Sequence, residues 1–223
     1  MILKKICLFL ILLLVPFIVS AEELNLTENA KSAILIESST GEVLYSKNPH
    51  EKLAPASMTK IMSLILIMEN IENGNLKWND IVVVSKNAAS MGGSQIFLEA
   101  NEMMTVEDLV KGICIASGND AVVALAEKIA GTEAAFVKLM NDKAKSLGLN
   151  NTKFVNSTGL DADGHYSSSY DMAMMAKELV KHEKILEFSS IYEDYLRENT
   201  NNSFWLVNTN KVVYKNYYSR KLL

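Results

Sequence analysis

The chain has 223 residues, a formal net charge of −4 and 49% hydrophobic residues. This is the composition of an ordinary globular domain, and it lacks the basic excess typical of nucleic-acid-binding proteins, so no nucleic-acid partner is expected. Two cysteines and three histidines argue against a disulfide-stapled scaffold and against a His/Cys zinc site.

Residues 1–21 have the parts of a secretory signal peptide in the usual order. Lys4 and Lys5 are followed by an apolar run over 6–19 and by the small residues Ser20 and Ala21. The sequence predicts export, with residues 22–223 acting on the cell-wall side of the cytoplasmic membrane. The alternative is an uncleaved anchor helix, but the run is shorter than the about 20 apolar residues of a bilayer span. Membrane association is expected only if this segment is retained.

The first predicted element after this segment is a β-hairpin. Strands over 31–37 and 43–46 flank a turn that contains Gly41. Pro55 precedes a long helix, about Ser57 to Asn73, which is apolar on nearly every face and is therefore predicted to be central and buried. A short strand or an extended piece is predicted over 81–85.

The second half of the chain is predicted to be mostly helical. Thr105 and Asp108 form a capping box for a helix that runs to about Ala116. Helices follow over 119–130, 132–147 and from Ser168 to about His182, the last with a methionine stripe expected to pack in the core. Strands are predicted over 192–197 and 204–208. Together these elements indicate an α+β domain, rich in helices, with an N-terminal β-hairpin.

Ser57 and Lys60 stand three residues apart at the start of the predicted central helix. Residues at this spacing share a helix face, so the lysine amine reaches the serine hydroxyl. A serine needs a neighbouring base to act as a nucleophile, and burial lowers the pKa of a lysine toward the range of a base. The pattern also fits a simpler reading, in which Ser57 caps the helix and Lys60 is exposed.

Ser117, Gly118 and Asn119 form a second polar cluster between two predicted helices. One interpretation is a capping turn, in which Ser117 or Asn119 caps the following helix. The other is a pair of side chains that enter a cleft, where the hydroxyl relays a proton and the amide binds a substrate amide. Cys114, in apolar surroundings, is interpreted as buried filler rather than as a nucleophile.

With these motifs the chain resembles the low-molecular-mass penicillin-binding proteins, the serine D-alanyl-D-alanine carboxypeptidases of peptidase family S11. The resemblance runs from about residue 28 to about residue 211. The motifs that carry it are Pro55-Ala-Ser-Met-Thr-Lys60, Ser117-Gly-Asn-Asp-Ala121, Gly92-Gly-Ser-Gln-Ile-Phe97, Gly164-His-Tyr-Ser-Ser168 and Asn208-Thr-Asn210. It implies the transpeptidase fold shared with β-lactamases.

The resemblance also implies roles. Ser57 is expected to be the acyl-enzyme nucleophile, with its backbone N–H as half of the oxyanion hole. Lys60 is expected to be the base, Ser117 a proton relay and Asn119 a ligand of the substrate backbone. The implied substrate is the peptidoglycan pentapeptide, whose terminal D-alanine is removed, and β-lactams are the implied covalent inhibitors. The resemblance implies no metal and no organic cofactor.

The sequence departs from this family in one motif. The family has Lys-Thr-Gly shortly after Asn-Thr-Asn, and no Lys-Thr-Gly occurs in this chain. We therefore predict residues 22–223 to be a carboxypeptidase domain truncated before that motif, lacking C-terminal sheet strands and weak or inactive in turnover. The alternatives are a non-catalytic peptidoglycan- or β-lactam-binding remnant and a non-functional gene fragment.

His165 and the pair of Asp161 and Asp163 are further candidates for catalysis or for metal binding. His165 is expected to shape a loop rather than to act as a general base, although histidine titrates near neutral pH. Asp161 and Asp163 do not complete the ligand spacing of an EF-hand calcium loop. A class A β-lactamase shares the Ser57 and Lys60 pair, but the chain has no convincing Glu-x-x-Leu-Asn segment for deacylation.

Overall fold

The computed structural model describes residues 26–198 and 200–213. The chain divides into two units, Met1–Ala30 and Lys31–Leu223. In the first, the Ala30 N–H donates to the Thr27 carbonyl at 3.1 Å. The predicted signal peptide over 1–21 lies outside the described residues.

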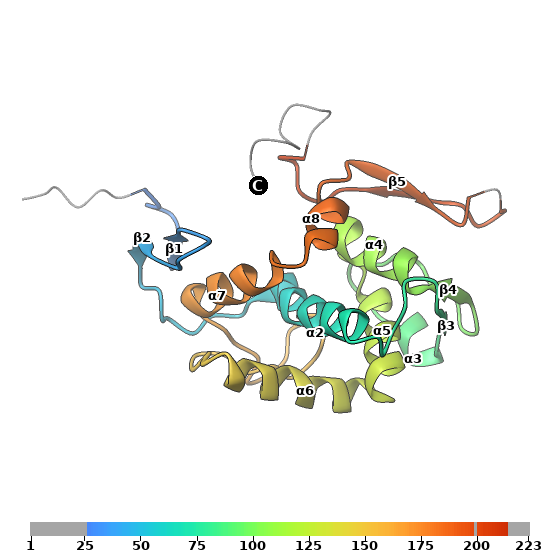
Figure 1. Ribbon diagram of the computed structural model, residues 1–223, viewed down its shortest axis with the longest axis horizontal. Helices are drawn as coiled ribbons and strands as arrows, with labels where there is room; N and C mark the ends of the chain where they lie inside the picture. Colours follow the sequence, from blue (N-terminus) through green and yellow to red (C-terminus); the bar gives the residue numbers. More distant parts are fainter. Residues whose placement is uncertain (1–25, 199, 214–223) are drawn as a thin grey trace, which may run out of the picture. The chain divides into compact units, whose positions relative to one another are not determined.

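The described part of the second unit combines short helices with three two-stranded antiparallel sheets, β1–β2, β3–β4 and β5–β6 (Figure 1). The helical elements are η1 Ala56–Thr59, α2 Lys60–Glu72, α3 Lys86–Ala89, α4 Val106–Ala116, α5 Asn119–Ala130, α6 Glu133–Ser146, α7 Ser169–Leu179 and α8 Glu183–Ser189. The strands are β1 Ala33–Ile36, β2 Val43–Lys47, β3 Ile81–Val83, β4 Met103–Thr105, β5 Glu193–Leu196 and β6 Phe204–Val207. The predicted α+β class is confirmed.

The predicted N-terminal hairpin is present, with Ala33 opposite Lys47 and a register shift at Leu35 and Ile36. Its turn is organised by Glu37, and the backbone N–H groups of Ser39 and Thr40 lower the pKa of its carboxyl group to about 2. The hairpin also leaves large apolar side chains in solvent. Leu35, Val43 and Leu44 are all exposed.

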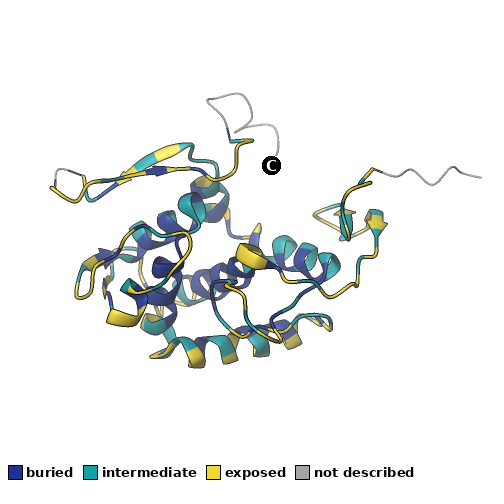
Figure 2. Ribbon diagram, turned by 180° about the vertical axis from the view of Figure 1, so that it is seen from behind, coloured by how far each residue is buried: buried dark blue, intermediate teal, exposed yellow. Residues whose placement is uncertain are grey.

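Helix α2 is the central element, as its all-round apolar sequence predicted. It contacts α5, α6 and α7, while α4 packs on α5 and α8. Its residues from Met62 to Met68 are buried, and Figure 2 shows the buried residues concentrated in the helices. The methionine stripe of α7 is core packing, because Met172 and Met175 are buried and Met174 packs against the core.

Helix caps follow the predicted chemistry closely. Thr105 accepts from the Asp108 N–H at 3.1 Å, which is one half of the predicted capping box, but the Asp108 carboxylate accepts from the Thr105 hydroxyl at 2.8 Å rather than from the Thr105 backbone N–H. Thr132 and Ser168 cap α6 and α7 in the same way, through the N–H groups of Ala135 and Asp171. These side chains satisfy N–H groups that a helix cannot pair internally.

Two predicted boundaries are wrong, and one strand was not predicted. The long helix was expected from Ser57, but an α-helix begins only at Lys60 and Ser57 lies on the 3₁₀ turn η1. The fourth helix was expected to reach about His182, but α7 ends at Leu179 and the separate helix α8 follows. The strand or extended piece predicted over 81–85 is present, with β3 over Ile81–Val83 and an extended Ser85, but its partner β4 was not predicted.

Within residues 26–198 and 200–213, no helix combines the length and apolarity needed to cross a bilayer.

Candidate active site

Ser57 and Lys60 lie side by side at the start of the central helix. Ser57 is on the 3₁₀ turn, in which side chains three residues apart eclipse each other more closely than on an α-helix. Lys60 Nζ is 3.1 Å from Ser57 Oγ. Ser57 is exposed while Lys60 is only 4% exposed, so the reading of Lys60 as a solvent-facing lysine is wrong.

Lys60 is held by neutral partners. Its amine donates to Ser57 Oγ and, at 2.9 Å, to the carbonyl of Thr158. In the described part of the chain it forms no ion pair with a carboxylate. Burial therefore acts unopposed and lowers the pKa of Lys60 to about 8. About a tenth of the molecules then carry the neutral amine at pH 7, which is the form that accepts a proton.

The backbone just before Ser57 is strained. Ala56 has φ of 47°, in the left-handed region that costs a residue with a Cβ about 1–2 kcal/mol. Gly159 packs directly against its carbonyl group, since a Cβ built on Gly159 would lie 1.8 Å from the Ala56 oxygen. Gly159 itself has φ of 88°. Only glycine fits both the space and the conformation at this position.

The turn that contains Gly159 is organised by Asn156. Asn156 Oδ1 accepts from the N–H groups of Gly159 at 2.7 Å and Thr158 at 3.2 Å, and Nδ2 donates to the Leu160 carbonyl at 2.7 Å. This is the local hydrogen bonding by which asparagine favours turns. The turn presents the Thr158 carbonyl to Lys60. Sequence reasoning missed Asn156, although an asparagine three residues before a glycine is a recognisable turn signal.

Ser117 and Asn119 lie at the junction of α4 and α5. Ser117 ends α4 with φ of 57°, and Gly118 is the N-cap of α5 with no side-chain cap bond. The interpretation of Ser117 or Asn119 as a side-chain cap is therefore wrong. Among the described residues, neither side chain hydrogen-bonds to Ser57 or Lys60.

Asn119 is buried and oriented. Its Nδ2 donates to the Gly92 carbonyl at 2.7 Å, and its backbone N–H donates to the Ser94 carbonyl at 2.7 Å. Its Oδ1 is buried and, among the described residues, has no hydrogen-bond partner. A buried unpaired acceptor is costly, so this atom is suited to receive a donor from a ligand.

The two polar clusters are joined through glycine contacts. A Cβ on Gly93 would lie 2.8 Å from Asn119 Nδ2 and 3.4 Å from Leu160 Cδ2. Leu160 follows Gly159, which touches the Ala56 carbonyl. Contacts therefore run from Asn119 through Gly93 and Leu160 to the turn that carries Ser57.

Asp120 holds the loop around Asn119. It is 1% exposed, and its carboxylate accepts from the N–H groups of Ile96 at 3.1 Å and Leu98 at 3.0 Å. These bonds fix the loop that follows Gly92 and Ser94, the two backbone partners of Asn119. Asp120 belongs to a motif recognised in the sequence, but no role was predicted for it.

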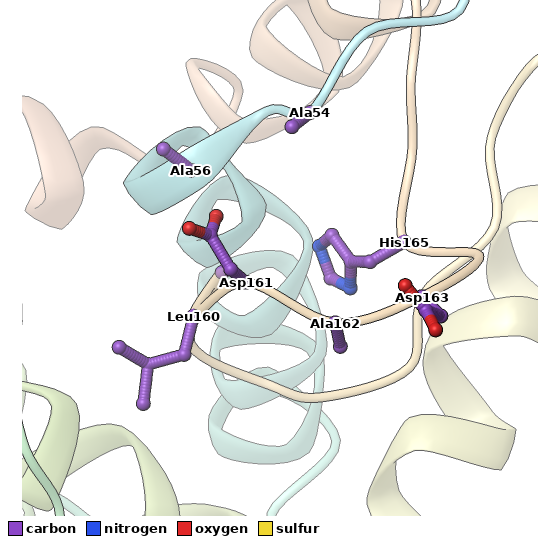
Figure 3. A pocket seen from close by; sticks show the side chains of 8 residues that line it. Ala54, Ala56, Leu160, Asp161, Ala162, Asp163 and His165 are labelled. Atoms are coloured by element: carbon purple, nitrogen blue, oxygen red, sulfur yellow. The ribbon is translucent and has the colours of Figure 1, made fainter.

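A pocket of about 320 Å³ opens beside the Ser57 turn. Figure 3 shows its lining, which consists of Ala54, Ala56, Gly159, Leu160, Asp161, Ala162, Asp163 and His165. The imidazole of His165 points from its own segment toward the helical turn that carries Ala56.

Other chemistries find little support in the described residues. Within them, no group of three or more His, Cys, Asp or Glu side chains is placed to hold a metal ion. Cys114 is a free thiol, and burial raises its pKa to about 12. It is therefore a poor thiolate nucleophile, in agreement with its interpretation as filler.

A serine hydroxyl in contact with a desolvated lysine at the start of a buried helix provides the two groups that covalent catalysis by serine requires. The family model described as D-alanyl-D-alanine carboxypeptidase, peptidase family S11, matches residues 18–222. The chain belongs to this family.

The chain is similar to several individual members. It is 64% identical over 189 residues to the D-alanyl-D-alanine carboxypeptidase DacF of Bacillus subtilis strain 168, covering 85% of this chain and 49% of that protein. It is 38% identical over 194 residues to DacA of Escherichia coli K12, covering 84% and 47%. The chain thus spans about half the length of the curated relatives it matches.

Solved structures confirm the predicted fold. The carboxypeptidase DacD from Francisella tularensis matches with a TM-score of 0.77 and 35% identity, over 82% of this chain and 44% of that one. Penicillin-binding protein 6B from Escherichia coli matches with a TM-score of 0.78 and 33% identity, over 84% and 60%.

Proposed function

We propose that this chain carries the acylation machinery of a serine-type D-Ala-D-Ala carboxypeptidase that acts on peptidoglycan stem peptides. One observation carries the proposal. Lys60 Nζ lies 3.1 Å from Ser57 Oγ, and burial lowers the pKa of this lysine to about 8. The pair is a nucleophile with its base in contact, as covalent catalysis requires.

The reaction begins when the neutral Lys60 amine takes the proton of Ser57. Ser57 Oγ then bonds to the carbonyl carbon of the penultimate D-alanine, and the carbonyl oxygen becomes an oxyanion near the Ser57 backbone N–H. The peptide C–N bond breaks, and the leaving D-alanine nitrogen receives the proton from Lys60 by way of Ser117. Water then attacks the ester carbon of the acyl-enzyme and gives a proton to Lys60. The bond between this carbon and Ser57 Oγ breaks, Ser57 Oγ takes the proton back from Lys60, and the shortened peptide leaves with the neutral amine and the serine hydroxyl restored.

Asn119 supplies the binding contact in this scheme. One N–H of its Nδ2 is used by the Gly92 carbonyl, whereas its Oδ1 has no hydrogen-bond partner among the described residues and so can accept from a ligand. We assign it to the amide N–H of the bound stem peptide. This satisfies the unpaired acceptor, and the gain appears only when a peptide is bound.

β-Lactams are the proposed covalent inhibitors. The penicillin-binding protein D2 of Listeria monocytogenes, solved in an ampicillin-bound form, matches this chain with a TM-score of 0.71 and 28% identity. A β-lactam would acylate Ser57 in the step used for the peptide. Because the proposed substrate is a cell-wall polymer, the proposed site of action is outside the cytoplasm, reached by means of the predicted signal peptide.

The test is labelling of the purified chain with a fluorescent penicillin, together with an assay for D-alanine release from a pentapeptide. Ser57→Ala should abolish labelling, and Ser90→Ala, which removes an exposed hydroxyl, should not. Label that is covalent and depends on Ser57 supports the proposal. Penicillin that binds a folded sample without forming a covalent bond would favour the binding remnant instead.

A further inference from the structure

His165 is a buried histidine whose two ring nitrogens are both hydrogen-bonded. It is 7% exposed, and Nδ1 accepts from the Val155 backbone N–H at 3.0 Å. Nε2 lies 2.8 Å from Thr59 Oγ1. Because Nδ1 is an acceptor, the neutral imidazole carries its proton on Nε2 and donates it to the Thr59 hydroxyl.

Thr59 lies between Ser57 and Lys60 in sequence. It is fully buried, ends the 3₁₀ turn and is the N-cap of α2, yet its side chain caps no N–H of that helix. Its hydroxyl is used instead for His165, 106 residues further along the chain. This bond ties the turn that carries Ser57 to the segment on the other side of the pocket.

The hydrogen bond between Thr59 and His165 is made at a turn whose backbone is strained. Ala56, in the left-handed region, belongs to the same four-residue turn as Ser57 and Thr59. A strained turn keeps its geometry only when its surroundings hold it. Gly159 supports the turn at Ala56, Thr158 holds Lys60, and His165 holds Thr59.

We propose that His165 is a positioning residue, which holds the Ser57 turn in its acylating geometry through Thr59 and releases it when the imidazole gains a second proton. This inference rests on the proposed function. His165 does not touch the reacting atoms; it acts through Thr59.

Protonation acts through Nδ1. A proton there would face the Val155 N–H, so two donors would oppose each other and the ring would have to move. Burial lowers the pKa of His165 below its ordinary value, which keeps the imidazole neutral near pH 7. The charged groups around it are Asp161 and Asp163 in the shared pocket, Lys153, whose backbone pairs with Tyr166, and Lys60 beyond Thr59.

The test is the rate constant for acylation by a fluorescent penicillin, measured from pH 5 to pH 9 on the full chain and on variants. In the parent, loss of the neutral Lys60 lowers the rate by about tenfold per pH unit below about 8. Protonation of His165 adds a second, steeper fall at the acid end. His165→Gln places an amide donor near Nε2 and has no proton to gain, so it should keep the rate at pH 8 and lose the steeper fall.

Thr59 provides matched variants. Thr59→Ser keeps the hydroxyl and should keep the parent profile, whereas Thr59→Val keeps the shape and should acylate about tenfold more slowly at pH 8. Thermal unfolding of each variant is measured in parallel. If Thr59→Val does not fold, the comparison of His165→Gln with Thr59→Ser decides the matter through the shape of the pH profile.

Failure of the positioning role can be distinguished from failure of the proposed function. If the parent and Thr59→Ser are acylated but His165→Gln shows the same steep acid fall, His165 has no positioning role. The same holds if Thr59→Val reacts as fast as Thr59→Ser. If the folded parent is not acylated at any pH, the proposed function is wrong and the positioning role falls with it.

Discussion

Gly159→Ala should displace the Ser57 turn and destabilise the fold. The new Cβ would lie 1.8 Å from the Ala56 carbonyl oxygen and 2.9 Å from Thr59 Oγ1. Cβ atoms in proteins essentially never approach another heavy atom to less than 3.0 Å. The obstacle is backbone rather than a flexible side chain, so one of the two segments must move by about 1 Å. Overpacking of this kind costs about 1–3 kcal/mol, and the positive φ adds about 1–2 kcal/mol.

The same displacement also lowers the reaction rate. A displacement of about 1 Å at a reacting group costs about 100-fold in rate, so acylation by a fluorescent penicillin should slow by about that factor. The expected loss of about 2–5 kcal/mol in the free energy of unfolding should appear as a lower midpoint of thermal unfolding.

Gly131→Ala is the matched control. Gly131 has φ of 79°, close to that of Gly159, but a Cβ there would meet nothing within 4 Å. It should lose only the about 1–2 kcal/mol of backbone strain and keep its acylation rate. Equal acylation rates for the two variants would refute the argument that the contact between Gly159 and Ala56 positions Ser57.

Four further predictions concern charged groups and their partners. The acylation rate should rise with pH to a midpoint of about 8, and Lys60→Arg, which stays protonated, should be slow throughout pH 6–9. Folding lowers the pKa of Lys60 from 10.5 to about 8, so the unfolded chain binds more protons than the folded chain between these pH values. The free energy of unfolding should therefore rise with pH from about 8 to 10.5. Lys60→Met should abolish this rise in urea unfolding curves. Folding also lowers the pKa of His165 from 6.5, so stability should fall as pH drops below about 6.5, and His165→Gln should unfold with a weaker dependence on pH there. Asp120→Asn sets an amide against backbone N–H groups and should cost about 1–3 kcal/mol in thermal unfolding while weakening penicillin binding through Asn119.

Helices with local signals were predictable from the sequence. Helix α5 was predicted over 119–130 and found as Asn119–Ala130, because Gly131 marks its end. The capping box at Thr105 placed the start of α4. Strand β4 was missed because three residues carry little periodicity, and its only reason to be extended is its pairing with Ile81–Val83.

The candidate site, too, was predictable only where its contacts are local in the sequence. The contact between Ser57 and Lys60 follows from their spacing of three residues, so it could be predicted from the sequence. The partners of this pair lie far away in the chain: Thr158 is 98 residues from Lys60, and His165 is 106 residues from Thr59. Such contacts leave no local pattern, and in one sequence Asn156 and Gly159 look like an ordinary turn.

These distant partners explain how two unfavourable features coexist at the start of α2. Ala56 is strained and Lys60 is desolvated, and neither feature would persist in an isolated helix, where the turn would relax and water would solvate the amine. Residues 156–165 supply the carbonyl for Lys60, the close contact at Ala56 and the bond to Thr59. The reactivity proposed for Ser57 therefore depends on the docking of this segment as much as on the serine and the lysine. Loosening it should lower the acylation rate before the fold is lost.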